Sequence, residues 1–293
     1  MYELHQVGEQ SYYIDCPVKI GVYKQTETEV YLIDSGNDRE AGKKILKIAS
    51  GNGWKIRGII NTHSNADHIG GNHYLQEQTG CRIFARGVEA AFIRHPMLEP
   101  AFLYGGYPCM ELRGKFLMAS ESDAVDFTHP DFPAELEVIP LPGHFFDMAG
   151  IRTPDDTVFL ADSVYSRTIL EKYRVPFIYD VARYLETLDR IEGMRARMFV
   201  PAHAGVTEDI RSLVRFNRAK IYAIEEKLLS VCRDSLCTDE IIRRIFMEYG
   251  LTMGIEQYVL VGSTLRSFLS WMKERRQITF SCTDNRLLWK SVE

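Results

Sequence analysis

Residues 61–72 read NTHSNADHIGGN. This stretch places His63, Asp67 and His68 within six residues, directly after the apolar run RGIIN and directly before a pair of glycines. Imidazole and carboxylate groups gathered in one turn at the end of an apolar run are typical of a metal site. An asparagine, Asn65, lies midway between the first histidine and the aspartate.

On both sides of this stretch, short apolar runs alternate with helical segments. The runs that read as strands, each ending at a polar residue or a turn, are 30–36, 57–60, 81–85, 135–144, 157–163 and 197–203. Helical patterns occupy 39–50 and 73–80, and both of these segments are followed by or end in glycine. Strands interleaved with helices predict an α/β fold.

Two segments break this alternation. Residues 95–133 are rich in Pro, Gly, Met and aromatic residues without a sustained period, which predicts an irregular insert that forms a lid or a pocket wall. After His203 the chain predicts three helices over 209–232, 238–250 and 259–276, then a hairpin that turns at Asp284 and Asn285. We therefore expect an α/β domain over 1–207, which carries the stretch 61–72 and would be the catalytic domain if that stretch binds metal, and a helical, winged-helix-like domain over 208–293.

The composition is that of a soluble globular protein, with 293 residues, 45% hydrophobic and 26% charged. The N-terminus MYELHQVGEQ lacks a signal-peptide pattern, and no apolar run reaches the ~18 residues needed to cross a bilayer. The six cysteines contain no C-x-x-C pair, which predicts reduced thiols packed in the core. These features predict a cytoplasmic protein without membrane contact.

The net charge of −5 is divided unevenly along the chain. Residues 1–210 carry 21 basic and 30 acidic residues, a net −9, whereas residues 211–293 carry 14 and 10, a net +4. A surplus of this size permits contact with an anionic partner but is equally typical of solvated helix faces.

Potential metal ligands stand at the ends of several predicted strands. His63, His144, Asp162 and His203 each follow an apolar run, and Asp67 and His68 follow closely after the first of them. Loops at neighbouring strand ends converge on one edge of a layered fold, so these side chains are expected to meet there. A set of imidazoles and carboxylates without cysteine predicts zinc, iron or manganese in a catalytic role.

The motif H-S-N-A-D-H, followed in order by His144, Asp162 and His203, resembles the metallo-β-lactamase superfamily signature H-x-H-x-D-H…H…D…H. The resemblance covers roughly residues 1–205. It implies an αβ/βα four-layer sandwich with a dinuclear centre at one edge. It also implies that one ion is held by His63, position 65 and His144, the other by Asp67, His68 and His203, and that Asp162 bridges both. Asp34 matches a family aspartate that supports the centre from behind.

Asn65 departs from that signature, which has histidine at this position. An amide oxygen is a weaker donor to Zn²⁺ than imidazole, so we expect a weakened first site and one or two zinc ions per chain, with iron or manganese as alternatives. Asn65 is expected either to act as an oxygen ligand or to hydrogen-bond a bound water.

A metal-bound hydroxide predicts a hydrolase that acts on a small-molecule ester, thioester or lactone. Asp67 would also orient the attacking water and accept its proton. Tyr165 lies three residues after Asp162, a D-x-x-Y spacing that resembles the lactonases of the superfamily, where the phenol hydrogen-bonds the substrate carbonyl.

Three other functions remain open from the sequence. A phosphodiester-cleaving nuclease resembles the superfamily's mitochondrial β-lactamase-like endoribonuclease, but a net +4 over the last 83 residues does not favour nucleic acid as the partner. The others are a di-iron redox protein and a metal-binding protein without hydrolytic activity. The sequence does not predict an oligomeric state.

Overall fold

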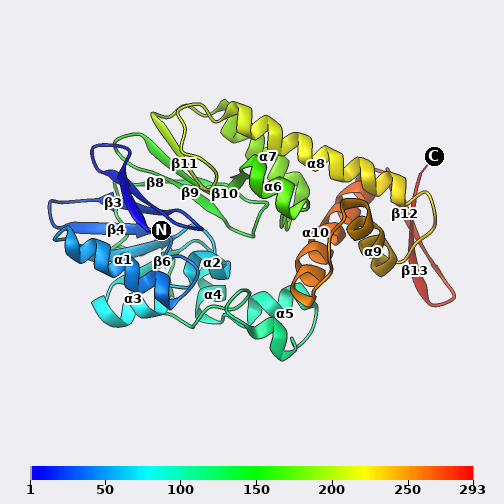
Figure 1. Cartoon of the computed structure of the whole chain (residues 1–293), viewed down its shortest axis with the longest axis horizontal. Coiled ribbons are helices and arrows are strands. Elements are labelled where there is room, and N and C mark those ends of the chain that lie inside the picture. Colours follow the sequence, from blue (N-terminus) through cyan, green and yellow to red (C-terminus); the bar gives the residue numbers. More distant parts are fainter. Residues whose placement is uncertain (1, 293) are drawn as a thin grey trace.

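The computed structural model describes residues 2–292, which form a sandwich of two β-sheets covered by helices (Figure 1). The first sheet contains seven strands in sequence order: β1 (Glu3–Gln6), β2 (Ser11–Asp15), β3 (Ile20–Lys24), β4 (Glu29–Ile33), β5 (Lys55–Asn61), β6 (Arg82–Ala85) and β7 (Ala124–Val125). Its first four strands pair antiparallel, and β4 to β7 pair parallel.

The second sheet has the strand order β11-β10-β9-β8. Its strands are β8 (Glu137–Pro140), β9 (Ala149–Arg152), β10 (Thr157–Tyr165) and β11 (Met198–His203). Strands β10 and β11 run parallel, whereas β8, β9 and β10 pair antiparallel. All nine residues of β10 are buried, including the polar residues Thr157, Asp162 and Ser163.

The alternation of side chains along the strands builds the four layers. In β4, Tyr31 and Ile33 face the second sheet and pack in one core with Phe159, whereas Val30 and Leu32 pack beneath the helices on the outer face. Those outer helices are α1 (Arg39–Gly51) and α3 (Asn72–Thr79), and they contact each other. The four-layer αβ/βα sandwich predicted from the sequence is therefore confirmed.

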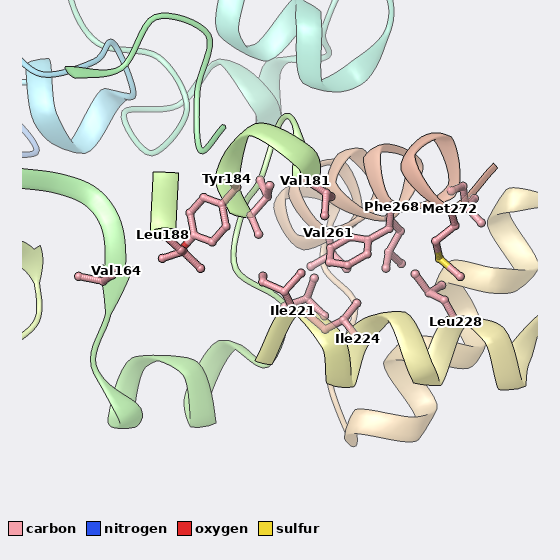
Figure 2. Close-up of a cluster of buried hydrophobic side chains, with 14 of the residues drawn as sticks. Val164, Val181, Tyr184, Leu188, Ile221, Ile224, Leu228, Val261, Phe268 and Met272 are labelled. Carbon is pink, nitrogen blue, oxygen red and sulfur yellow. The ribbon is translucent and has the colours of Figure 1, made fainter. Parts of the chain in front are cut away.

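The outer face of the second sheet is covered by α7 (Val181–Gly193) and α8 (Arg211–Val231). Buried apolar side chains of these two helices and of the second sheet form one cluster. Figure 2 shows that this cluster continues beyond the sheet, from Leu188 and Tyr184 of α7 to Phe268 of a later helix. A short helix, α6 (Arg167–Tyr173), connects β10 to this layer.

Residues after 210 form the predicted helical extension. It comprises α8, α9 (Thr238–Tyr249), α10 (Ile255–Glu274) and a hairpin of β12 (Ile278–Thr283) and β13 (Arg286–Ser291). Asp284 and Asn285 both adopt positive φ, 50° and 59°, as the predicted hairpin turn requires. The long α8 begins beside the sandwich and runs towards α9, and the hairpin lies at the far end of the molecule (Figure 1).

The insert 95–133 is more regular than the sequence predicts. It contains α5 (Leu98–Tyr104), a 3₁₀ turn, η1 (Met110–Arg113), and strand β7, and it follows the short helix α4 (Glu89–Arg94). Leu103, Leu112 and Leu117 of the insert pack with Val259 of α10, so tertiary contacts fix a segment without its own hydrophobic period. The insert therefore joins the sandwich to the C-terminal extension.

All six cysteines are free, as predicted, but Cys109 and Cys282 are exposed. The prediction of core packing is wrong for these two, because they lie at the surface, in the insert and in the terminal hairpin. Among the described residues, none of the helices combines the length and the apolar character needed to span a membrane.

Candidate metal centre

The seven predicted ligands lie on one edge of the sandwich, where strands of both sheets end. His63 follows β5, Asn65 precedes the short helix α2 (Ala66–Ile69), and α2 contains Asp67 and His68. From the second sheet, His144 follows β8, Asp162 lies inside β10, and His203 ends β11. Two of the resulting groups have ligand atoms within 4.8 Å of one another: His63, His144 and Asp162 in one, and Asp67, His68 and His203 in the other.

Unusual backbone geometry presents two of these residues. Ala161 adopts a φ of 49° inside β10, at a register shift against β11, and so turns Asp162 out of the regular strand. Gly143 precedes His144 with a φ of 123°, and an added Cβ there would lie 2.3 Å from the backbone nitrogen of Tyr184. Only glycine fits this position, which sets the direction of the His144 loop.

Asp34 supports both parts of the 61–68 turn. Its carboxylate accepts hydrogen bonds from the Thr62 backbone N–H and hydroxyl, both at 2.8 Å, and lies 2.8 Å from Nδ1 of His68. The Thr62 hydroxyl in turn lies 3.1 Å from Nδ1 of His63. With both Nδ1 atoms directed at these oxygens, the Nε2 atoms of both histidines point away from Asp34 and can offer a lone pair to an ion. Asp34 itself has a φ of 67°, a strained conformation at a buried position.

Asp162 lies between the two groups. Its Oδ1 is 2.9 Å from Nε2 of His68, and its Oδ2 is 3.1 Å from Nε2 of His203. The same Oδ2 lies 3.8 Å from Nε2 of His144. This position is the one that the family resemblance implies for a bridging carboxylate.

Asn65 joins the first group through its amide oxygen. Oδ1 lies 2.9 Å from Nε2 of His144, and the amide Nδ2 donates a hydrogen bond of 2.7 Å to Oε1 of Glu99. Nδ1 of His144 lies 3.0 Å from the Phe177 carbonyl oxygen, so Nδ1 can donate its proton there and leave Nε2 free to bind an ion.

Three buried atoms test whether these residues fit a metal ion. Nε2 of His63, Nε2 of His68 and Oδ1 of Asp162 have no hydrogen-bond partner within residues 2–292. Nε2 of His68 and Oδ1 of Asp162 approach to 2.9 Å without the angles of a hydrogen bond. Buried acceptors left unsatisfied are costly unless a cation is present, so the donor set fits metal ions.

The charges in the centre shift several pKa values. Burial, together with the neighbouring His68 and His144, lowers the pKa of His63 well below its ordinary value. Burial acts in the same direction on His203, but the carboxylates of Asp162 and Asp67 outweigh it and raise the pKa of His203 to about 9. Burial raises the pKa of Asp162, yet His203 and His68 hold it well below its ordinary range. The carboxylates and imidazoles of the centre are therefore strongly coupled electrostatically.

Tyr165 lies inside this network. Its hydroxyl is 3.1 Å from Oδ2 of Asp162 and 3.0 Å from Nδ1 of His144, and its ring stacks on His203 with centroids 5.6 Å apart. Burial and the Asp162 carboxylate raise the pKa of Tyr165 well above its ordinary value, so the phenol remains a proton donor.

Two buried glutamates near the centre were not predicted from the sequence. Glu89 accepts hydrogen bonds from the backbone N–H groups of Ser64, at 3.0 Å, and Asp147, at 2.8 Å, and so connects the loops that carry His63 and His144. Glu99 binds the Asn65 amide. The only sequence signal was an acidic residue within each of the apolar stretches EAAFI and LEPAFL, and that signal is weak.

The remaining histidines of the central region lie outside the centre. His73 is exposed and contacts the Glu121 carbonyl oxygen, and His129 contacts Arg82. Phe102 of the insert packs against Phe145 and Phe146, whereas Tyr104 and Tyr107 are exposed. A surface cavity of about 300 Å³ beside Gly143 and Arg183 is lined by none of the seven predicted ligands.

Comparison with known families supports the same architecture. The family model described as the metallo-beta-lactamase superfamily matches residues 13–203, a range that contains every predicted ligand.

Similar proteins with assigned activities are hydrolases. The chain is 24% identical over 194 residues to the atrochrysone carboxyl ACP thioesterase of Aspergillus fumigatus. The aligned region covers 65% of this chain and 52% of that protein. It is 32% identical over 139 residues to the hydroxyacylglutathione hydrolase of Erythrobacter litoralis, and this aligned region covers 45% of each protein. The chain thus spans about half the length of the curated relatives that it matches.

Solved structures extend the likeness to the whole chain. A β-lactamase domain protein from Burkholderia ambifaria superimposes with a TM-score of 0.75 at 16% identity and covers 99% of this chain and 94% of its own. A metallo-β-lactamase family protein from Thermus thermophilus superimposes with a TM-score of 0.70 at 16% identity, covering 100% and 98%. The fold is therefore shared through the C-terminal extension.

Proposed function

This chain belongs to the metallo-β-lactamase superfamily, and from that premise we propose that it is a metal-dependent hydrolase of small-molecule thioesters, esters or lactones. The observation that carries the proposal is the pair of ligand groups with Asp162 between them, in which Nε2 of His63, Nε2 of His68 and Oδ1 of Asp162 are buried without a hydrogen-bond partner. Such an arrangement serves no evident purpose in a purely structural core.

The residues that would hold the ions follow from the two groups. His63, His144 and the Oδ1 atom of Asn65 would hold the first ion, and Asp67, His68 and His203 would hold the second, with Asp162 shared. The donor set of imidazole, carboxylate and amide suits zinc, with iron or manganese as alternatives. When bound, such ions lower the pKa of water from 15.7 to about 7 and polarise a carbonyl oxygen.

The chain's own residues supply orientation and proton transfer. Asp67 is the most exposed of the carboxylates in the centre, with 41% of its side chain accessible, so it can accept a hydrogen bond from an incoming water. Partial burial raises the pKa of Asp67, but His68 and His203 hold it below its ordinary value, which keeps the carboxylate ionised. The Tyr165 hydroxyl is suited to donate a hydrogen bond to the carbonyl oxygen as negative charge develops on it.

The substrate class rests on the relatives. Their names, a carboxyl ACP thioesterase and hydroxyacylglutathione hydrolases, describe the removal of acyl groups. We therefore place thioesters first among the substrates, before simple esters and lactones. A phosphodiester is the alternative substrate, because the C-terminal extension carries a mild positive charge that could contact phosphate groups.

The test combines metal analysis with a substrate panel. Purified protein, reloaded with Zn²⁺, should contain between one and two ions per chain and should hydrolyse an acyl thioester or a lactone faster than a phosphodiester. Asp67→Ala and His68→Ala should each lower kcat by at least about 100-fold, because each removes a group that holds the reacting water or its ion.

The matched control is His73→Ala, which removes an exposed histidine five residues after His68. Its metal content and turnover should equal those of the wild type. A reloaded wild type that contains no metal, or an Asp67→Ala variant with normal turnover, would contradict the proposed function.

A further inference from the structure

Glu99 is a carboxyl group in an unusual place. It lies in α5 of the insert, its residue is only 6% exposed, and its Oε1 accepts a hydrogen bond of 2.7 Å from Nδ2 of Asn65. No basic side chain pairs with it among the ion pairs within residues 2–292. A buried carboxyl group whose neighbours are the Asn65 side-chain amide and the Ala66 backbone N–H, without a cationic partner, requires an explanation.

The contact decides which end of the Asn65 amide faces the centre. An amide can present either an oxygen acceptor or an NH₂ donor, and only the oxygen can ligate an ion. Because a carboxyl oxygen accepts from Nδ2, Oδ1 is left to face Nε2 of His144 at 2.9 Å. In the tautomer in which Nδ1 of His144 donates to the Phe177 carbonyl oxygen, Nε2 is also an acceptor with a free lone pair. Two acceptors thus face each other where the first ion would bind.

We propose that Glu99 is a positioning residue that holds the Asn65 amide with its oxygen towards the first ion. The inference rests on the proposed metal centre and deepens it, because it explains how asparagine serves at a position where the family motif has histidine. Glu99 does for the amide what a hydrogen-bonded carboxylate commonly does for a ligating histidine, which is to fix the rotation of the ligand.

Residues next to Glu99 in α5 pack against other parts of the molecule, including the C-terminal extension. Leu103, on the same short helix, packs with Leu112 and Leu117 of the insert and with Val259 of α10. On the other side, Phe102 packs against Phe145 and Phe146, which directly follow His144. Glu99 is therefore held by contacts from both the extension and the ligand loop, so its position does not depend on the Asn65 hydrogen bond.

The test measures ion binding and not only activity. Zn²⁺ affinity is determined in chelator-buffered solution, with the number of bound ions read by native mass spectrometry. Glu99→Leu removes the acceptor while filling most of its space, and should weaken the binding of the first ion about tenfold while that of the second changes less than about twofold. Glu99→Gln retains one carbonyl oxygen within reach of Nδ2 and should recover most of the loss.

A double-mutant cycle separates positioning from direct ligation. If Glu99 acts through Asn65, then Glu99→Leu should have no further effect on the first ion in an Asn65→Ala background. Glu111→Leu, which removes an exposed carboxylate from the same insert, is the control and should leave both affinities unchanged. Glu99→Ala provides a second variant without the acceptor if Glu99→Leu does not fold.

The outcomes distinguish this inference from the proposed function. Two ions bound with wild-type affinity by Glu99→Leu would overturn the role of Glu99 and leave the metal centre intact. A loss on Glu99→Leu that persists in the Asn65→Ala background would also overturn it, because Glu99 would then act without Asn65. A wild type that binds no Zn²⁺ would overturn both.

Discussion

Asn65 places an amide oxygen beside His144, where the related motif places a third imidazole. The amide is not loosely held, because Nδ2 is bound to a buried carboxyl group and Oδ1 lies 2.9 Å from Nε2 of His144. Its oxygen is nevertheless a weaker ligand for Zn²⁺ than an imidazole nitrogen. At the residue scale, the asymmetry between the two ligand groups is concentrated in this one side chain.

Replacing Asn65 with histidine should strengthen the first group. The two side chains share the same branch at Cγ, so an imidazole can point where the amide pointed and reach slightly further. We expect the Asn65→His variant to bind closer to two Zn²⁺ ions per chain, with the affinity for the first ion raised about tenfold, or about 1.4 kcal/mol. A chelator competition against the wild type under identical zinc buffering measures this. Two equally tight ions in the wild type would contradict the weakened first group.

Tyr165 offers a second test at the residue scale, of chemistry and not of metal binding. Tyr165→Phe removes the hydroxyl that lies within 3.1 Å of Asp162 and keeps the ring that stacks on His203. Metal content should stay constant, while kcat on a thioester or lactone should fall roughly 10–100-fold for the loss of one hydrogen bond to developing negative charge. Unchanged turnover would reduce Tyr165 to a packing residue, and a loss of metal would assign its hydroxyl to holding Asp162.

At the scale of elements, the centre depends on how loops from two sheets are joined. The loop after β5 carries His63 and the loop after β8 carries His144, and the carboxyl group of Glu89 binds a backbone N–H of each loop. Glu89 itself comes from α4, at the start of the insert region. Burial outweighs these donors and raises the pKa of Glu89 to about 7.

This raised pKa predicts how stability changes with pH. In the folded protein Glu89 keeps its proton up to about pH 7, whereas in the unfolded chain it loses the proton near pH 4.5, so the Glu89 contribution to stability declines as pH rises between these values. Glu89→Gln cannot titrate. The free energy of unfolding of the wild type relative to Glu89→Gln should therefore fall by about 3 kcal/mol between pH 4.5 and 7.5. Denaturant unfolding of the chelator-treated proteins measures this difference. A relative rise would show that the hydrogen bonds from the Ser64 and Asp147 backbone N–H groups outweigh the burial of the carboxylate.

The elements also show what the sequence could and could not predict. The alternation of apolar runs and helical segments predicted an α/β fold, and the resemblance of the ordered motif to the superfamily signature implied the sandwich. Potential ligands at the ends of the apolar runs predicted that these side chains meet at one edge. Glu89 and Glu99 escaped prediction because a glutamate in a short helix is usually solvated, and only the folded packing shows that both are buried against the ligand loops. The regular structure of the insert escaped for a related reason, since Leu103 and Leu112 find their partner in Val259, far along the chain.

At the scale of the whole molecule, the C-terminal extension shares a core with the sandwich. Tyr184 and Leu188 of α7 pack in one buried cluster with Ile224 of α8 and Phe268 of α10 (Figure 2). The insert adds a second connection, because Leu103 and Leu112 pack with Val259 of α10. This continuity bears directly on the predicted domain boundary near residue 207.

Truncation tests that boundary. A chain that ends at residue 207 would expose the apolar face of α7 and lose the cover of the second sheet, so it should unfold without cooperativity or at a temperature lower by more than about 10 °C. A chain that ends at residue 276 is the matched control, because most residues of the removed hairpin are exposed and Ile278 is the one buried residue of β12. That control should keep a cooperative transition within a few degrees of the full chain, with the same Zn²⁺ content. Differential scanning calorimetry of the three proteins measures the outcome. If residues 1–207 alone melt cooperatively near the full-length temperature and bind Zn²⁺ normally, the extension is an independent domain and neither the shared core nor the contact through α10 supports the centre.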